Sequence, residues 1–166
     1  MLLGLLTGLE RGFEASLFYT LSYVLMTLAA FGVLTQLEAG EAKIINIEDL
    51  RGLSARSPLL AAVLMILMFS MAGIPPLLGF MAKLSVLEAL VAQHMTYLAA
   101  LAMVFSVIGA FYYLRVIKEM YFSAGSEDKI NLDAGPAVAL RLNAAVIVIL
   151  GMVPAALFEL CKFAFG

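Results

Sequence analysis

The chain has 166 residues, of which 64% are apolar and only 13% are charged, and its mean hydropathy is +1.05. Soluble globular domains are roughly 45–50% apolar and about 25% charged, so this composition excludes an ordinary water-soluble domain. Ten lysines and arginines against twelve acids give a net charge of −2, which leaves no basic face for nucleic acid. The length allows about one domain, and we expect an all-α integral membrane fold.

The sequence lacks the motifs of common soluble enzymes. One histidine and one cysteine provide neither an internal disulfide nor the ligand spacing of a zinc or iron–sulfur site. We interpret Cys161 as a small apolar residue. No phosphate-binding loop and no nucleophile elbow occurs in the sequence. We therefore expect this chain to bind no metal and no cofactor of its own.

Charge-free stretches predict where the chain crosses a bilayer, because a spanning helix needs about 20 mostly apolar residues. The four predicted helices cover residues 15–37, 58–93, 95–120 and 137–160. Residues 1–9 are apolar but too short to cross, and we interpret them as the end of a preceding helix. Residues 12–166 are expected to form one transmembrane region.

The second predicted helix is too long for one ordinary crossing, since residues 58–93 would make about 50 Å of straight helix at 1.5 Å per residue. We expect a break at Gly73-Ile74-Pro75-Pro76, with Gly79 just beyond it. Pro76 lacks a backbone donor, and its ring forces the preceding residue out of the helical region. Two arrangements fit: one discontinuous span with overlapping halves, or two short crossings joined by a tight turn.

Loop charges choose between these arrangements, since cytoplasmic loops carry an excess of lysine and arginine. With one discontinuous span, six basic residues share one side: Lys43, Arg51, Arg56, Lys118, Lys129 and Arg141. The other side then holds Arg11 and Lys162. Two crossings would divide the same residues four against four. We therefore expect one discontinuous span, with the C-terminus outside the cytoplasm.

Lys83 is the most informative charged residue. It lies about ten residues from the polar Gln93-His94 turn, or about 15 Å, which is half the thickness of the hydrocarbon core. A lysine at that depth costs roughly 2.5–3.5 kcal/mol, and its partner must come from another helix, another subunit or water. Burial favours the neutral amine, so such a lysine can both hold and release a proton. Beyond a helix break, it indicates a proton or ion site.

Other polar residues are weaker candidates for a proton path. Glu88 lies nearer the interface, on a different face of the helix from Lys83, and His94 lies in a turn where exposure to solvent is expected. Tyr19 and Tyr23 share one helix face, where they either line a wet path or join helices. We interpret Tyr112-Tyr113 as an aromatic anchor at the membrane interface.

Three motifs resemble the antiporter-like membrane subunits of respiratory complex I, and their N-type members most closely. They are Glu48-Asp-Leu-Arg-Gly-Leu53, the stretch from Phe69 to Lys83, and Tyr112-Tyr-Leu-Arg-Val-Ile117. The resemblance implies the C-terminal part of the proton-conducting antiporter-like fold, in which a helix is broken at Pro75-Pro76. It also implies that Lys83 is the buried lysine that transfers protons, since M-type members carry a glutamate there.

The resemblance further implies a proton-translocating subunit of an NADH–quinone oxidoreductase in the bacterial inner membrane, which couples electron transfer from NADH to quinone with proton pumping. NADH, FMN, iron–sulfur clusters and quinone would then bind to other subunits, and the partners would be other membrane subunits of complex I and the lipid bilayer. Two alternatives stay open: a subunit of a multi-subunit sodium/proton antiporter, and a structural membrane segment without its own proton path. The first repeat of the family is missing, so a complete proton path is not expected here.

Overall fold

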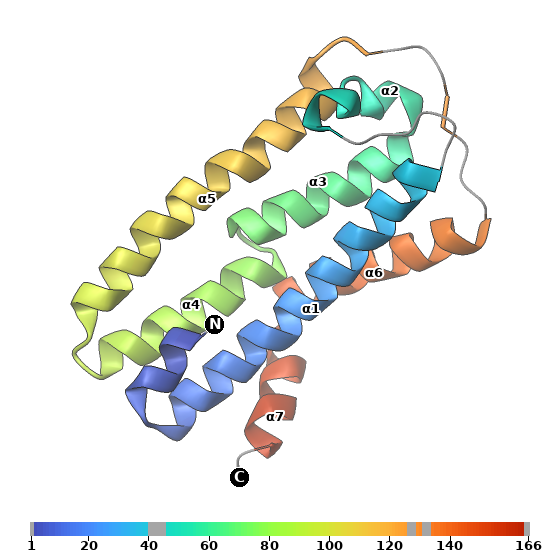
Figure 1. Cartoon of the computed structure of the whole chain (residues 1–166). Coiled ribbons are helices and arrows are strands. Elements are labelled where there is room, and N and C mark those ends of the chain that lie inside the picture. The colour runs from blue at the N-terminus through green and yellow to red at the C-terminus, as the bar shows by residue number, and fades with distance from the viewer. Residues whose placement is uncertain (1, 40–45, 126–128, 131–133, 165–166) are drawn as a thin grey trace.

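A computed structural model describes residues 2–39, 46–125, 129–130 and 134–164, and every regular element in that part of the chain is a helix. In chain order the elements are η1 (Leu2–Thr7), α1 (Glu10–Ala39), η2 (Ile47–Leu50), α2 (Leu53–Arg56), α3 (Pro58–Ala72), α4 (Leu78–Ala92), α5 (Thr96–Phe122), α6 (Ala134–Met152) and α7 (Ala155–Phe163), shown in Figure 1. Three of the described helices are long and apolar enough to cross a membrane: Glu10–Glu38, Thr96–Phe122 and Gly135–Met152. The all-α membrane fold is therefore confirmed.

The second predicted helix is divided into α3 and α4, which follow one another in the same direction across the molecule (Figure 1). Their ends overlap, because Ser70 near the end of α3 contacts Gly79 at the start of α4. This is the discontinuous span favoured by the loop charges, and not a pair of crossings. Pro75 and Pro76, which are joined by a cis peptide bond, lie in the connection.

A Schellman motif ends α3. Gly73 has the left-handed φ of 88°, which glycine adopts without the steric cost of a side chain. The N–H of Ile74 donates to the carbonyl oxygen of Phe69 at 3.0 Å. The N–H of Gly73 donates to the carbonyl oxygen of Ser70, also at 3.0 Å. The carbonyls of Met71 and Ala72 are left without partners from this motif.

The prediction of one continuous helix over residues 137–160 is wrong in one respect. The helix is interrupted at Val153 and Pro154, which separate α6 from α7. Pro154 is the cause, since it has no N–H to continue the helical ladder. The first helix also begins earlier than predicted, at Glu10, where an acidic residue is favourable in the first turn. Charge alone therefore did not mark the start of α1.

The N-terminal segment folds back on the rest of the chain. Leu2–Thr7 forms the 3-10 helix η1, and Gly8 turns the chain with a φ of 65°. Gly4 and Gly12 allow the close approach of η1 and α1, because a Cβ at either would meet atoms of the other element. Within residues 1–9, the described part is this short 3-10 helix, and its interpretation as the end of a preceding helix stays a prediction.

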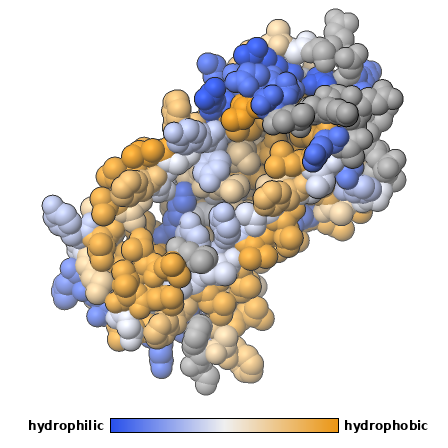
Figure 2. Space-filling view, viewed as in Figure 1, coloured by the Kyte–Doolittle hydropathy of each residue, from blue (hydrophilic) through white to orange (hydrophobic). Residues whose placement is uncertain are grey.

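The helices α1, α3, α4 and α6 share one apolar core. Among its fully buried side chains are Phe18, Leu60, Leu67, Leu78 and Ile147. The helix α5 differs, because its described buried residues lie near its two ends, at Ala99, Ile117 and Met120. Figure 2 shows a mostly hydrophobic surface whose largest hydrophilic part lies at the end that carries α2, with smaller hydrophilic spots at the opposite end. This distribution suits a bundle with its middle in lipid and its two ends in water.

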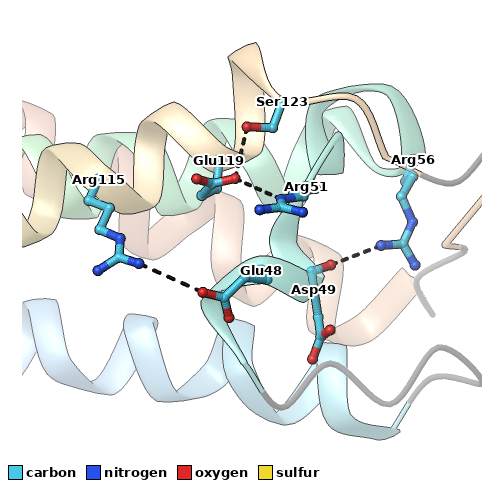
Figure 3. A network of polar contacts seen from close by, with 7 residues as sticks. All are labelled: Glu48, Asp49, Arg51, Arg56, Arg115, Glu119 and Ser123. Carbon is cyan, nitrogen blue, oxygen red and sulfur yellow. Dashed lines mark hydrogen bonds and ion pairs between the residues drawn. The ribbon is translucent and has the colours of Figure 1, made fainter.

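A network of polar contacts ties η2 and α2 to the end of α5 (Figure 3). Arg51 Nε lies 3.1 Å from Glu119 Oε2, which also accepts a hydrogen bond from Ser123 Oγ at 2.8 Å. Arg115 Nη2 lies 3.7 Å from Glu48 Oε1. The motif that begins at Glu48 thus holds the end of α5 in place.

Candidate functional site

Lys83 lies in α4, slightly more than one turn beyond the helix break, and reaches back across it. Its Nζ donates hydrogen bonds to the carbonyl oxygens of Met71 at 3.0 Å and Ala72 at 2.8 Å. These are the two carbonyls that the Schellman motif leaves without partners. The amine of one half of the broken helix therefore caps the C-terminus of the other half.

The energetics of this cap favour a cation. The C-terminus of a helix carries a partial negative charge, so an ammonium is stabilised beside it. Hydrogen bonds to a charged group contribute about 1.5–3 kcal/mol each, against a cost of roughly 2.5–3.5 kcal/mol for a lysine in the membrane centre. The two carbonyls therefore offset part of the cost of a charged Lys83 in a membrane.

Gly73 makes room for the lysine. A Cβ at this position would lie 3.0 Å from both Cδ and Nζ of Lys83. The residue also has a positive φ, so a side chain there would be strained even without the lysine. The predicted break residue Gly73 therefore both ends α3 and borders Lys83.

Ser70 and Gly79 join the two halves a second time. The N–H of Gly79 donates to Ser70 Oγ at 3.0 Å, and that hydroxyl donates to the sulfur of Met26 in α1 at 3.1 Å. A Cβ on Gly79 would collide with the carbonyl oxygen of Ser70. Gly79 is thus required by the close approach of α3 and α4.

The helix α6 contacts the break through its own last turn. A Cβ on Gly151 would lie 2.5 Å from the N of Leu78 and 2.6 Å from the C of Leu77, and would collide with the carbonyl oxygen of Pro76. Gly151 lies next to the end of α6 at Met152. Two interrupted helices therefore meet at their interruptions.

Lys83 is half-buried and borders a cleft of about 720 Å³ between α5 and the rest of the bundle. Other polar side chains on its wall are Tyr19 of α1 and Tyr113 and Ser106 of α5. Figure 2 shows a hydrophilic spot recessed among hydrophobic side chains on this side of the molecule. The other residues that line the cleft are apolar or glycine.

The structure brings together some of the predicted residues and separates others. Tyr19 lines the cleft with Lys83, whereas Glu88 and His94 are exposed. Tyr23 lies one turn from Tyr19 and is 44% exposed. Sequence reasoning missed Tyr113, which borders the cleft and was interpreted as an interfacial anchor together with its neighbour.

Among the described residues, no group of three or more histidine, cysteine, aspartate or glutamate side chains could hold a metal ion. Cys161 is buried and free, and it lies in the core cluster. The polar chemistry beside the cleft is therefore that of one amine, backbone carbonyls and hydroxyl groups. Such groups can bind water and move protons.

The chain resembles known membrane proteins over nearly its full length. It is 42% identical over 167 residues to the NADH-quinone oxidoreductase subunit N of Coxiella burnetii, covering 99% of this chain and 35% of the relative. A chain of respiratory complex I from Thermus thermophilus with bound aureothin superposes with a TM-score of 0.77 at 28% identity, over 92% of this chain and 35% of that one. A chain of the Mrp complex from Dietzia shares the fold, with a TM-score of 0.78 at 23% identity, over 93% of this chain and 37% of that one.

The chain thus spans about a third of the length of the curated relatives that it matches. The family described as NADH:quinone oxidoreductase/Mrp antiporter, transmembrane, matches residues 1–109. That match covers α1, the broken helix α3–α4 with Lys83, and the first half of α5. The chain belongs to the NADH:quinone oxidoreductase/Mrp antiporter transmembrane family.

Proposed function

We propose that this chain is part of a proton-translocating membrane subunit of an NADH–quinone oxidoreductase, and that Lys83 takes up and releases the proton. The observation that carries the proposal is the position of its Nζ, which is bonded to two carbonyls at a helix break and borders a cleft. The name of the relatives, NADH-quinone oxidoreductase subunit N, supports the choice of complex.

The geometry suggests how one proton moves. A protonated Lys83 is stabilised by the carbonyls of Met71 and Ala72 and by the helix terminus. A change in the surrounding charge lets the ammonium give one proton to water in the cleft, which leaves a neutral amine. The neutral amine still has N–H groups for the same carbonyls, so the broken helix stays joined. Uptake of a proton from water on the other side completes the cycle.

The remaining parts of the activity belong to the rest of the assembly. NADH, FMN, iron–sulfur clusters and quinone would bind to other subunits, and this chain would contact other membrane subunits of complex I and lipid. The first half of the proton path would come from the part of the relatives that this chain does not span. The C-terminus would lie outside the cytoplasm of a bacterial cell, as the loop charges favour.

A sodium/proton antiporter subunit is the second candidate, because the family includes Mrp antiporters and the Mrp complex shares the fold. Among the solved structures, the complex I chain is 28% identical and the Mrp chain 23% identical, which supports the first candidate. Curated relatives named NADH-quinone oxidoreductase subunit N, at 42% and 46% identity, support it further. A sodium requirement for proton transport at constant NADH oxidation would instead support the antiporter.

The test replaces Lys83 in the full-length protein within its assembled complex. Lys83→Ala should lower NADH-driven proton translocation in inverted membrane vesicles, while native gels show the complex at its normal amount. Lys118→Ala is the matched control, because Lys118 is exposed near the end of α5. Unchanged translocation in Lys83→Ala would contradict the proposal.

A further inference from the structure

We infer that the cleft beside Lys83 is a binding site for a free long-chain fatty acid, whose carboxylate pairs with the amine of Lys83 and whose acyl chain lies against the apolar wall. Binding can be measured without any proton transport. The consequence for transport rests on the proposed function, because a carboxylate that holds Lys83 as an ammonium hinders the release of its proton.

The cleft has the size and the lining of a small-molecule site. Its volume of about 720 Å³ lies within the range of roughly 300–1,000 Å³ that is typical of ligand pockets. Its walls come mainly from α4 and α5, and their side chains are mostly apolar. Among them are Phe80, Leu84 and Leu87 of α4 and Met103, Phe105 and Val107 of α5. Such walls suit an acyl chain, which gains many weak contacts by close packing.

One group carries the charge of this lining. Among the described residues that line the cleft, Lys83 is the one charged side chain, and none is an aspartate or a glutamate. An ammonium has three N–H donors, and the carbonyls of Met71 and Ala72 accept two of them. The third donor is then available to a ligand. A cation without a carboxylate beside it favours an anionic group at this point.

The exposed flank of α5 gives the cleft an entrance from the lipid. Met103, Phe105 and Val107 line the cleft, and each is more than half exposed. The same helix is long and apolar enough to cross a membrane. An amphiphile dissolved in the bilayer can therefore enter sideways, between α5 and α4.

The depth of Lys83 favours a free fatty acid over a phospholipid. The sequence places Lys83 about 15 Å from the Gln93-His94 turn, which is half the thickness of the hydrocarbon core. The phosphate of a phospholipid is charged and stays at the interface, because moving a charge to the membrane centre is costly. A fatty acid also has an uncharged form, which brings its carboxyl group to this depth without that cost.

The binding step is a proton transfer that creates no net charge. The carboxylic acid breaks its O–H bond and gives the proton to the neutral amine of Lys83, which forms a new N–H bond. The products are a carboxylate and an ammonium, joined by a charge-assisted hydrogen bond. The ammonium keeps its bonds to the carbonyls of Met71 and Ala72. An occupied site therefore holds Lys83 in its protonated form.

The experiment photolabels the full-length protein in its assembled complex, embedded in lipid nanodiscs. The probe is palmitic acid with a diazirine in the middle of its chain. Two matched probes carry the same chain: its methyl ester, which has no carboxylate, and a phosphatidylglycerol, whose charge stays at the interface. Labelled peptides are identified by mass spectrometry.

Three variants accompany the unaltered complex. Lys83→Met removes the amine, and Gly109→Leu fills the cleft from α5 while keeping Lys83. Gly109 suits this purpose because it lines the cleft and no atom lies within 4 Å of its Cβ position. Lys118→Ala is the control, because Lys118 is an exposed lysine near the end of α5.

We expect palmitic acid to label the walls of the cleft in α4 and α5. Lys83→Met should lower this labelling about tenfold or more, the change that follows from losing one hydrogen bond between charged groups. Gly109→Leu should lower it as well, whereas Lys118→Ala should not. An unlabelled cleft, undiminished labelling of Lys83→Met, or equal labelling by the methyl ester or the phosphatidylglycerol would each overturn the inference.

Transport gives a second measurement, which separates the two proposals. Palmitic acid should slow NADH-driven proton translocation more in the unaltered complex than in Gly109→Leu, since leakage through the lipid is the same in both. Equal slowing would overturn the effect on transport. A labelled cleft with normal translocation in Lys83→Ala would contradict the proposed function alone. An unlabelled cleft with low translocation in Lys83→Ala would contradict the fatty-acid site alone.

Discussion

The backbone N–H of Gly79 donates to the hydroxyl of Ser70 at 3.0 Å, and this bond crosses from the second half of the broken helix to the first. The same contact brings the Cα of Gly79 so close to the carbonyl of Ser70 that no Cβ fits. The broken helix is therefore a packed joint in which each half caps the other: Ser70 caps the start of α4, and Lys83 caps the end of α3.

Gly79→Ala tests this joint. We expect a loss of stability at the upper end of the roughly 1–3 kcal/mol seen for overpacking, because the added methyl meets backbone and not a flexible side chain. The measurement is the thermal unfolding of the purified complex in detergent, together with its amount in membranes. Gly109→Ala in α5 is the control, because no atom lies within 4 Å of its Cβ position. Equal stability of the two variants would contradict the overlap.

Gly151→Ala tests the contact between α6 and the break. The new methyl should push Pro76 and Leu77 away, which moves the start of α4 and so displaces Lys83 from its carbonyls. We expect slower proton translocation and lower thermal stability of the complex. Gly135→Ala in the same helix has open space around it and should behave as the unaltered protein. A Gly151→Ala complex with normal translocation would show that the two interruptions are independent.

The ion pair between Arg51 and Glu119 tests the polar network. Arg51 is 51% exposed, so this pair lies at the surface and should contribute little to stability, and less still at high salt. Glu119→Arg should destabilise the end of α5, and the charge swap Arg51→Glu/Glu119→Arg should restore part of the loss. The unfolding temperature of the complex, measured at low and at high ionic strength, gives the effect of each variant and its dependence on salt. A charge-swap complex that is less stable than the Glu119→Arg complex would argue against a pairwise contact.

The direction of the chain through the membrane gives a further prediction. The end of α5 and the end of α7 lie at opposite ends of the bundle (Figure 1). Reporter fusions in the loop after α5 should therefore be cytoplasmic, and fusions after α7 should be outside the cytoplasm. Two reporters on the same side would contradict the single discontinuous span.

The break itself could be predicted from the sequence, because Pro75, Pro76 and a long charge-free stretch leave few alternatives. The interruption before α7 was missed, although Pro154 carries the same signal as Pro76. The reason is length: residues 137–160 fit one crossing, so nothing required a break there. A proline inside a charge-free stretch predicts an interruption even where the length does not demand one.

The partner of Lys83 could not be predicted from sequence spacing, because Met71 and Ala72 contribute backbone atoms and not side chains. A usable signal was nevertheless present, since a helix that ends at a glycine leaves carbonyls that attract a cation. The position of Tyr113 in the wall of the cleft could not be predicted for another reason. Neighbouring residues on a helix point about 100° apart, and composition does not tell which of two tyrosines turns inward.

Lys83→Arg in the assembled complex tests the central claim most directly. Arginine keeps a cation and donors for the carbonyls of α3, but it does not release a proton in proteins. We predict a normal amount of complex with NADH-driven proton translocation as low as in Lys83→Ala. Translocation at the rate of the unaltered complex in Lys83→Arg would contradict the account, because Lys83 would then be a fixed cap of the broken helix and not a proton carrier.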